Sequence, residues 1–180
     1  MNEMSVTYEH RQKGGWAFYA MVFSTMLVAG VFAGPVLLQV LGSERPASHP
    51  LAGLLVVALL TEAAMIWGTM MMHSLTVRIE GQTLHVRFGP GVFHKRFDLG
   101  QVAACRPVRN TWLHGWGIHW MAGAWVYNIA GYDAVELEIR SGKRVRIGTD
   151  EPEALADAIH QWMARKAHNP PEKRDLRGDP

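Results

Sequence analysis

Two long apolar runs come first in the hydrophobic pattern of the chain. Residues 16–41 contain no charged side chain, and residues 51–72 contain one, Glu62. Each run is long enough to cross a bilayer as an α-helix, which needs about 20 apolar residues. The segment between the runs is short, polar and contains proline. The two runs are therefore predicted to form an antiparallel transmembrane hairpin.

Beyond residue 74, apolar and polar positions alternate, as they do in half-buried β-strands. The alternation predicts strands over residues 75–80, 84–88, 93–99, 102–108, 125–129, 133–140 and 144–148. Lys95 interrupts the pattern, which indicates a bulge or an edge strand. In the last hairpin, a three-residue turn with Gly142 or Lys143 in the left-handed region would place Glu138 opposite Arg146.

A C-terminal helix is predicted to follow these strands. Asp150 as N-cap and Glu153 three residues later form a capping-box pattern, with Pro152 in the first turn. Apolar residues then recur at helical spacing up to Lys166, which indicates an amphipathic helix with one buried face. Residues 167–180 are charged and rich in proline, so they are predicted to be a disordered tail.

The predicted order of about seven strands and one amphipathic helix is typical of a small antiparallel barrel or sandwich that the helix closes. The stretches HGWGIHW and YNIAGYDAVELEIRSGKRVRIGTDEPEALADAI are similar to the bacterial pleckstrin-homology-like (PH-like) domains that follow one or two transmembrane helices. The resemblance covers residues 75–165. It implies a membrane-tethered domain for binding or scaffolding, and it brings no catalytic residues.

The expected fold class is therefore a membrane-anchored α+β protein. Its expected parts are a cytoplasmic N-terminal segment (1–15), a transmembrane hairpin (16–73), a PH-like β domain with a C-terminal helix (74–166) and a disordered tail (167–180).

Positive residues near the apolar runs predict the orientation of the hairpin. They are Arg11 and Lys13 before the first run, Arg45 between the runs, and Arg78, Arg87, Lys95 and Arg96 after the second. Because cytoplasmic segments carry the excess of Lys and Arg, a multi-pass protein of the bacterial inner membrane with both termini cytoplasmic is expected.

The composition excludes several classes of function. The single cysteine, Cys105, cannot form an internal disulfide, which fits a reducing compartment, and it excludes a cysteine-cluster metal site. Arg106 could lower the pKa of this thiol, but a buried strand cysteine is favoured. The net charge of +2, with aromatic residues that do not alternate with basic ones, argues against nucleic-acid binding.

A segment rich in tryptophan and histidine separates the fourth and fifth predicted strands. Its tryptophans, with the one that opens the fifth strand, are Trp112, Trp116, Trp120 and Trp125. The spacing of four would align the first three on a helical turn, although Gly115 and Gly117 weaken a helix. Packing at the membrane surface or on the anchor helices is favoured over core packing, since tryptophan is enriched at membrane interfaces.

A haem or metal site in the same segment is the sharper alternative. His114, His119 and Met121 are suitable ligand types, but they show no known ligand spacing. No cofactor is therefore expected.

Three further features concern the hairpin. Glu62 lies near the centre of a predicted span, where a carboxylate is a candidate for function. The alternative is a protonated side chain that hydrogen-bonds Ser24 or Thr25, or a second copy. Gly30 and Gly34 form a small-residue pattern that permits close helix packing, within the hairpin or in a homodimer.

Basic residues point outward from the predicted strands and surround the last turn. Those singled out are Arg78, Arg87, Arg96, Lys143, Arg144 and Arg146. Such residues gain energy near an anionic leaflet, so they are candidates for contact with lipid headgroups. They are also what keeps the outer face of any sheet soluble.

Two hypotheses for function follow. The first is a non-catalytic membrane protein whose PH-like domain binds a protein partner, a lipid headgroup or another copy of itself. The second is a small redox or transport component that uses Glu62 or a cofactor held by residues 111–125. The sequence contains no phosphate-binding loop or nucleophile motif, so no enzyme is expected.

Overall fold

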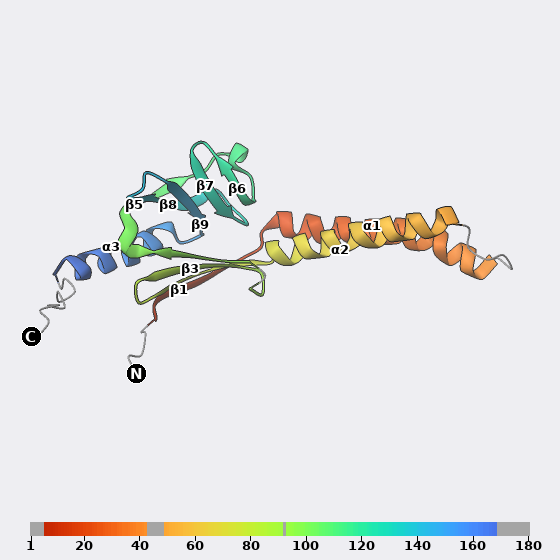
Figure 1. The fold of residues 1–180 in the computed structure, drawn as a ribbon, viewed down its shortest axis with the longest axis horizontal. Helices are drawn as coiled ribbons and strands as arrows, with labels where there is room; N and C mark the ends of the chain where they lie inside the picture. Colours follow the sequence, from red (N-terminus) through yellow and green to blue (C-terminus); the bar gives the residue numbers. More distant parts are fainter. Residues whose placement is uncertain (1–5, 43–48, 92, 169–180) are drawn as a thin grey trace, which may run out of the picture.

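The computed structural model describes residues 6–42, 49–91 and 93–168. Two long helices, α1 (Trp16–Gly42) and α2 (His49–Met72), pack against each other and project from a β domain (Figure 1). The predicted pair of apolar helices is confirmed, each with ends within two residues of the sequence prediction. The predicted disordered tail lies outside the described residues, apart from the end of the last helix.

The helical hairpin is inserted between two neighbouring strands of one sheet. Strand β1 (Val6–Lys13) precedes the hairpin and pairs antiparallel with β2 (Ser74–Glu80), which follows it. The pairing continues to the base of the helices, where the amide of Gly14 donates to the carbonyl of His73 at 2.8 Å. The N-terminal segment is therefore part of the β domain, and no linker separates the domain from the hairpin.

The first sheet has the order β1-β2-β3-β4, with β3 (Thr83–Phe88) and β4 (Phe93–Asp98) completing it. Alternate residues of β2 and β3 are buried, as predicted, and β4 forms the free edge. Lys95 therefore marks an edge strand. The β3–β4 register has no shift at this residue, so the bulge interpretation is wrong.

The second sheet has the order β5-β8-β9-β7-β6. Its strands are β5 (Val102–Arg109), β6 (Gly117–Met121), β7 (Ala124–Asn128), β8 (Asp133–Ile139) and β9 (Arg144–Gly148). Strand β9 lies between β7 and β8 and pairs parallel with β7, so the sheet is mixed and the prediction of an all-antiparallel sheet is wrong. All seven predicted strands are present, but β1 and β6 bring the described total to nine.

Each missed strand lacks the apolar alternation on which the prediction depended. The inward positions of β1 are Tyr8, His10 and Gln12, so its buried side is largely polar. Strand β6 lies inside the Trp/His segment, where a helical spacing of tryptophans competed with it. Gly115 and Gly117 both have positive φ, which ends the short 3₁₀ turn at Trp112–His114. The helical interpretation of this segment is wrong.

The register of the last hairpin differs by two residues from the prediction, because its turn begins one residue earlier. Its loop is Arg140–Gly142, closed by a 2.8 Å bond from the amide of Ile139 to the carbonyl of Lys143. Gly142 takes the left-handed position with φ 82°, as the third residue of such a loop favours. As a result Arg146 lies opposite Glu136, and Glu138 lies opposite Arg144.

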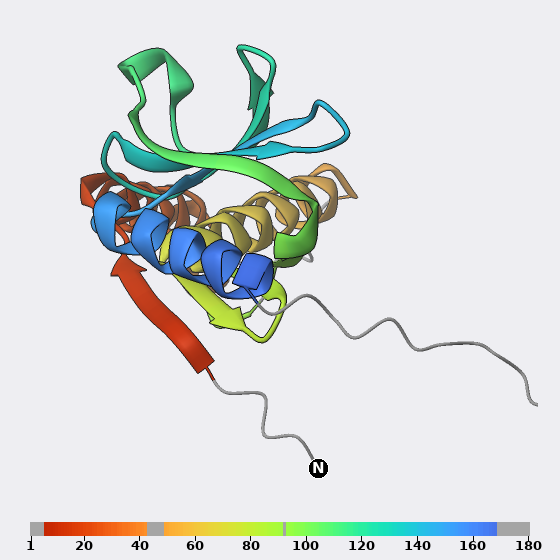
Figure 2. The ribbon, with the colours of Figure 1, turned by 90° about the vertical axis from the view of Figure 1, so that its left-hand side faces the viewer.

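Helix α3 (Pro152–His168) covers the end of the domain that faces away from the hairpin (Figure 2). It packs on β5 and β8 and buries one apolar face, as predicted. The predicted N-cap is wrong: the carboxylate of Asp150 lies 2.6 Å from Nε2 of His10 on β1. The hydroxyl of Thr149 instead accepts a bond from the amide of Glu151 at 3.1 Å.

The core of the domain lies between the two sheets and under α3. It includes Leu75, Val77, Ile79, Leu84, Val86, Phe88, Leu99, Val102, Cys105, Ile129, Val135, Leu137, Ile147, Leu155 and Ile159. Helix α3 closes one side of this two-layer arrangement, and the side between β4 and β7 stays open.

Candidate binding cleft and its surroundings

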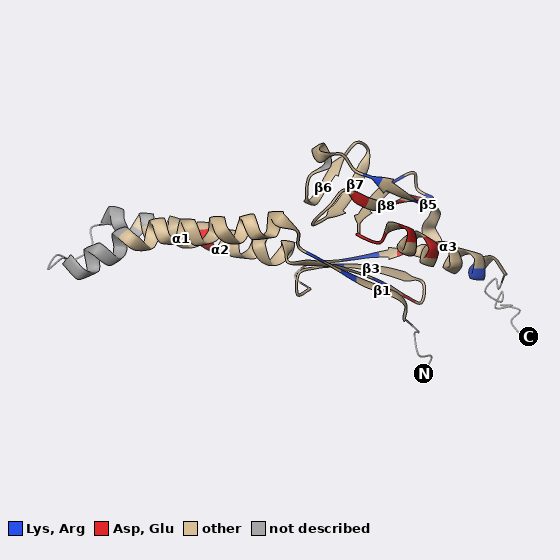
Figure 3. Ribbon diagram, turned by 180° about the vertical axis from the view of Figure 1, so that it is seen from behind, with Lys and Arg blue, Asp and Glu red and all other residues tan. Residues whose placement is uncertain are grey.

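The hairpin exposes apolar side chains along its length. Two stretches, Trp16–Gly34 and Leu55–Met72, are long and apolar enough to cross a membrane, and only 0% and 11% of their residues are buried. Figure 3 shows no Lys or Arg on the described part of the hairpin. These helices are therefore unlike the core helices of a soluble protein, which bury their apolar face.

Polar groups within the hairpin pair differently from the prediction. The hydroxyl of Thr25 donates to the carbonyl of Met21 at 2.8 Å and lies 3.5 Å from the hydroxyl of Thr69 on α2. Ser24 is exposed. Glu62 lines a small apolar pocket of about 260 Å³ between the helices, and its Oε2 has no hydrogen-bond partner among the described residues. The predicted bond from Glu62 to Ser24 or Thr25 is therefore wrong.

The small-residue pattern of α1 does not make the helix contact within the hairpin. A Cβ atom added at Gly30 or Gly34 would meet no atom of a described residue within 4 Å. The close approach involves Gly68 of α2, where an added Cβ would lie 3.1 Å from Cε of Met21. The intramolecular role predicted for Gly30 and Gly34 is therefore wrong, and the homodimer role stays a prediction.

The tryptophans of the Trp/His segment gather at the end of the domain from which the hairpin projects, where Figure 1 shows β6 and β7. Trp116 packs edge-on against Trp16 at the start of α1, with ring centroids 5.1 Å apart. Trp112 and Trp120 are 76% and 63% exposed. Trp125 lies opposite Trp120 on β7 and is also exposed. Trp116 is therefore the tryptophan of this segment whose ring packs on a ring of the hairpin. Trp120 and Trp125 share the strand face that carries Tyr127.

The histidines of this segment form no evident metal centre. His119 and Met121 alternate with Trp120 along β6, so they occupy the other face of the strand. The side chain of His114 lies outside the described residues. Among the described residues, no cluster of three or more His, Cys, Asp or Glu side chains could hold a metal ion.

A cleft of about 690 Å³ opens between β4 and the second sheet. Aromatic rings line it: Tyr127 stacks against Phe93 at 6.4 Å and meets Phe97 edge-on at 5.7 Å, and Trp125 lies beside it. The hydroxyl of Tyr127 forms no hydrogen bond with any described residue. Burial raises the pKa of this phenol, so the group is a neutral donor at physiological pH.

Three cations line the same cleft: Lys95, Arg96 and Lys143. All three are exposed, and none forms an ion pair or hydrogen bond with another described residue. Asp98 is the carboxylate of the lining. It already accepts bonds from Nε2 of Gln82 and from the amide of Gly100, both at 2.7 Å, which lower its pKa.

Two of these cations, Arg96 and Lys143, were predicted as site residues. Lys95 and Tyr127 were missed. The signal for Lys95 was present, since a lysine at an inward strand position must face either a core or an opening. No pattern in the sequence could reveal that Tyr127 faces an opening, because inward aromatic residues usually mark the core.

A second, apolar pocket of about 680 Å³ lies at the base of the hairpin. The hairpin contributes Ala17, Met21, Trp67, Gly68, Met71 and Met72 to its wall. The domain side includes Phe88, Phe93, Trp116 and Ile118. Phe93 and Ile118 also line the aromatic cleft. The two spaces are therefore neighbours that share Phe93 and Ile118. The apolar pocket lies on the flank of the helices, and the aromatic cleft carries the three cations.

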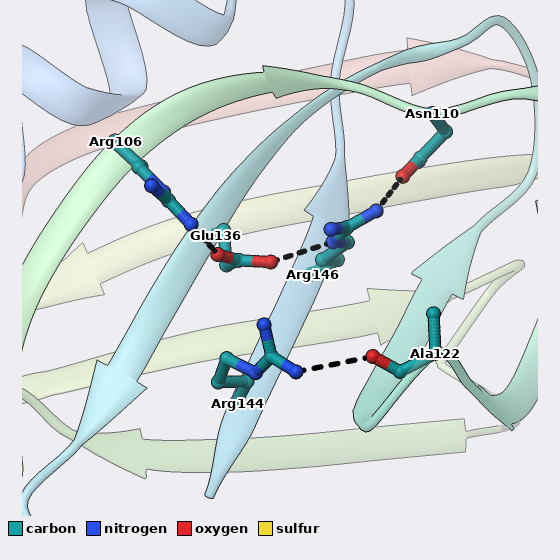
Figure 4. Close-up of polar contacts among 6 residues, drawn as sticks. All are labelled: Arg106, Asn110, Ala122, Glu136, Arg144 and Arg146. Carbon is teal, nitrogen blue, oxygen red and sulfur yellow. Dashed lines mark hydrogen bonds and ion pairs between the residues drawn. The ribbon is translucent and has the colours of Figure 1, made fainter.

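Other predicted basic residues are held by internal bonds (Figure 4). Glu136 is fully buried and accepts from Nη2 of Arg106 at 2.6 Å and from Nε of Arg146 at 2.7 Å. Arg144 donates to the carbonyl of Ala122 at 3.1 Å. Burial alone would raise the pKa of Glu136, but the two arginines outweigh it and hold the pKa below its usual range. Arg144 and Arg146 therefore serve the fold.

The outer face of the first sheet carries a histidine pair among arginines. Nδ1 of His85 lies 2.9 Å from Nε2 of His94, and their rings are stacked. Burial is the main cause that lowers the pKa of both, and Arg87 and Arg96 lower them further. Arg87 is exposed, whereas a neighbouring arginine of the same face is ion-paired: Arg78 lies 3.8 Å from Glu9 and 3.5 Å from Glu80.

Cys105 is buried, and its burial raises the pKa of the thiol to about 11. The prediction of a buried strand thiol is confirmed, and this cysteine is not a thiolate nucleophile near neutral pH.

Compared with known proteins, the chain matches no protein-family model and no curated protein.

Proposed function

We propose that this chain is a non-catalytic membrane protein whose hairpin crosses the bilayer and whose PH-like β domain contacts anionic lipid headgroups at the membrane surface. One observation carries the proposal. The hairpin interrupts a sheet between paired strands, with Lys13 opposite Ser74 and Gly14 bonded to His73 at 2.8 Å. The position of the domain relative to the helices is therefore fixed by strand pairing.

The exposed side chains of the hairpin support a bilayer location. They include Tyr19, Phe23, Met26, Leu27, Val31, Val56, Val57, Leu59, Leu60 and Ile66. A soluble protein rarely exposes a contiguous apolar patch of more than a few hundred Å². In lipid the same surface is favourable, and the helices satisfy their own backbone hydrogen bonds there.

The basic residues support an orientation in the inner membrane. Arg11 and Lys13 precede the hairpin, and Arg87 follows it on the same sheet. The sequence between the two helices contains Arg45 as its one Lys or Arg residue. The positive-inside rule then places the domain and both termini in the cytoplasm. The pairing of β1 with β2 supports this, because it keeps both ends of the hairpin on one side.

The aromatic end of the domain supports contact with the bilayer surface. Trp112, Leu113 and Trp120 are exposed. Trp116 of the same segment packs on Trp16 of α1 and lines one pocket with Trp67 of α2. Tryptophan favours the headgroup region because its ring is apolar and its N–H can bond with water. Exposed cations nearby, such as Arg87, would add electrostatic attraction to an anionic leaflet.

The test measures the depth of this end in the membrane. In a Cys105→Ala background, Leu113→Cys is labelled with a nitroxide, and the full chain is reconstituted into vesicles that contain phosphatidylglycerol. Electron paramagnetic resonance then compares collisions of the label with oxygen, which enters lipid, and with a water-soluble nickel chelate. We expect label 113 to favour oxygen.

The matched control is Ala164→Cys on the exposed side of α3, at the opposite end of the domain. Its label should favour the nickel chelate. If label 113 behaves like label 164, the aromatic end is free in water and suited to a protein partner or a second copy, and the proposed contact with lipid is wrong.

A further inference from the structure

The aromatic cleft has features that contact with headgroups does not explain. We propose that it binds one long-chain fatty acid taken from the surrounding bilayer, with the carboxylate at Lys95 and Lys143 and the chain directed toward the hairpin. This inference rests on the proposed function, because the ligand enters from the membrane.

The space for the chain consists of two adjoining pockets with mainly apolar linings. Met21 and Gly68 on the flank of the helices begin it, and Phe93 and Ile118 form the wall shared by the two spaces. Each space, at about 690 and 680 Å³, lies within the 300–1,000 Å³ usual for small-ligand sites. A flexible hydrocarbon chain can follow adjoining apolar and aromatic surfaces of this size.

The charges place the acidic end of the ligand. Strand β4 leads away from the hairpin and rises about 3.4 Å per residue, so Lys95 lies roughly 7 Å beyond Phe93. Lys143 faces Lys95 across the cleft, from the turn between β8 and β9. Neither forms an ion pair with a described residue, so a carboxylate would find two uncommitted cations at the end of an apolar passage.

The Tyr127 hydroxyl adds a neutral donor within the passage. It lies among Phe93 and Phe97 and makes no hydrogen bond with any described residue. The hydroxyl oxygen is not one of the buried polar atoms that lack a partner, so it is accessible and can donate to an acidic headgroup in the cleft. A neutral lipid would leave the two lysines uncompensated. The site should therefore prefer an anionic chain over an uncharged one of the same length.

The experiment uses the full chain in phosphatidylcholine vesicles and two photoactivatable probes that share one diazirine-bearing chain. One probe is the palmitic acid derivative and the other is the matching alcohol. After irradiation, mass spectrometry maps the cross-linked peptides. We expect the acid to label the peptides that contain Phe93, Phe97 and Tyr127, and excess palmitate to suppress this labelling. The alcohol should label the cleft several-fold less.

Charge variants separate the site from general attraction to the membrane. Lys95→Glu and Lys143→Glu should each lower cleft labelling by the acid by about fivefold for every unit of charge changed. Arg165→Glu on exposed α3 is the control of equal charge and should leave the labelling unchanged. All three positions lie on the surface, so folding should persist.

Cleft labelling that is equal for acid and alcohol, or acid labelling confined to α1 and α2, would overturn the inference. Vesicle flotation of the same samples keeps the two proposals apart. If the chain floats with the vesicles but its cleft is not labelled, only the fatty-acid inference is wrong. If the chain does not float, the proposed function is wrong.

Discussion

At the scale of single residues, the basic side chains divide by what the fold already does with them. Arg146 and Arg106 neutralise the buried Glu136, and Arg144 bonds a backbone carbonyl. Removing one member of such a buried pair is costly, because it leaves an uncompensated charge. Lys95 and Lys143 form no ion pair or hydrogen bond with a described residue. Free cations at an apolar cleft are therefore better candidates for binding than the larger set of outward arginines.

The histidine pair predicts a pH dependence of stability. The pKa of His85 and of His94 is lower in the folded protein than in an unfolded chain, chiefly through burial. The two histidines therefore do not reduce stability above the pKa of about 6.5 that they have in the unfolded chain. As the pH falls below about 6.5 and through their pKa values in the folded protein, the free energy of unfolding decreases. At His85, the charge of Glu80 partly offsets the lowering of the pKa, whereas the charges of Arg87, Arg96 and Arg78 lower the pKa further.

The measurement is the thermal unfolding midpoint of the full chain in detergent between pH 8 and pH 5. The wild-type midpoint should fall more steeply below about pH 6.5 than that of the double variant His85→Gln, His94→Gln. The other titrating groups are common to both proteins, so the difference isolates the pair. Parallel curves would show that the pair does not lose stability on protonation.

At single residues, the sequence could not predict the strand register or which residue of another segment each side chain contacts. The alternation identified the outward face of the last hairpin, yet Arg146 lies opposite Glu136 because Gly142 occupies the third loop position. The tryptophans were identified as one cluster, but whether each faces solvent, the hairpin or the cleft depends on contacts between distant segments. Trp116 meets Trp16 across 100 positions of sequence, which no local pattern encodes.

At the scale of elements, the decisive feature is the junction between the first sheet and the helices. Gly14 and Gly89 bring three segments together here: a Cβ at Gly14 would collide with the carbonyl oxygen of Met72, and one at Gly89 with that of Met70. Helices α1 and α2 were predictable from their long apolar runs, and α3 and seven strands from their periodicity. Strand β1 was not, because its partner lies beyond both helices and its own buried side is polar.

Gly14→Ala should therefore loosen the junction. Its methyl group has no room beside Met72, and the 2.8 Å bond to His73 would be strained. Overpacking of this kind costs about 2 kcal/mol. The thermal unfolding midpoint in detergent should fall accordingly. Gly30→Ala on the open face of α1 is the control, since nothing lies within 4 Å of its added methyl group. Equal midpoints for the two variants would contradict a tightly packed junction.

At the scale of the whole molecule, the sheet and the hairpin form one continuous object. Strand β1 leads into α1, and α2 leads back into β2, which pairs with β1. The orientation of the helices in the bilayer therefore also sets the orientation of the domain. This places the exposed tryptophans and the entrance of the apolar pocket on the side toward the helices. The composition predicted a membrane anchor and a separate domain. It could not predict that the anchor interrupts the domain, because strand pairing across the hairpin is a long-range contact.

The most direct test of the central claim is the accessibility of the two ends of the molecule across the membrane. In a Cys105→Ala background, Ser43→Cys lies between α1 and α2 in the sequence, and Ala164→Cys lies on α3. Intact spheroplasts are treated with a membrane-impermeant maleimide, before and after lysis. We expect Ser43→Cys to react in intact spheroplasts and Ala164→Cys to react only after lysis. Reaction of both cysteines only after lysis would show that the hairpin does not cross the membrane.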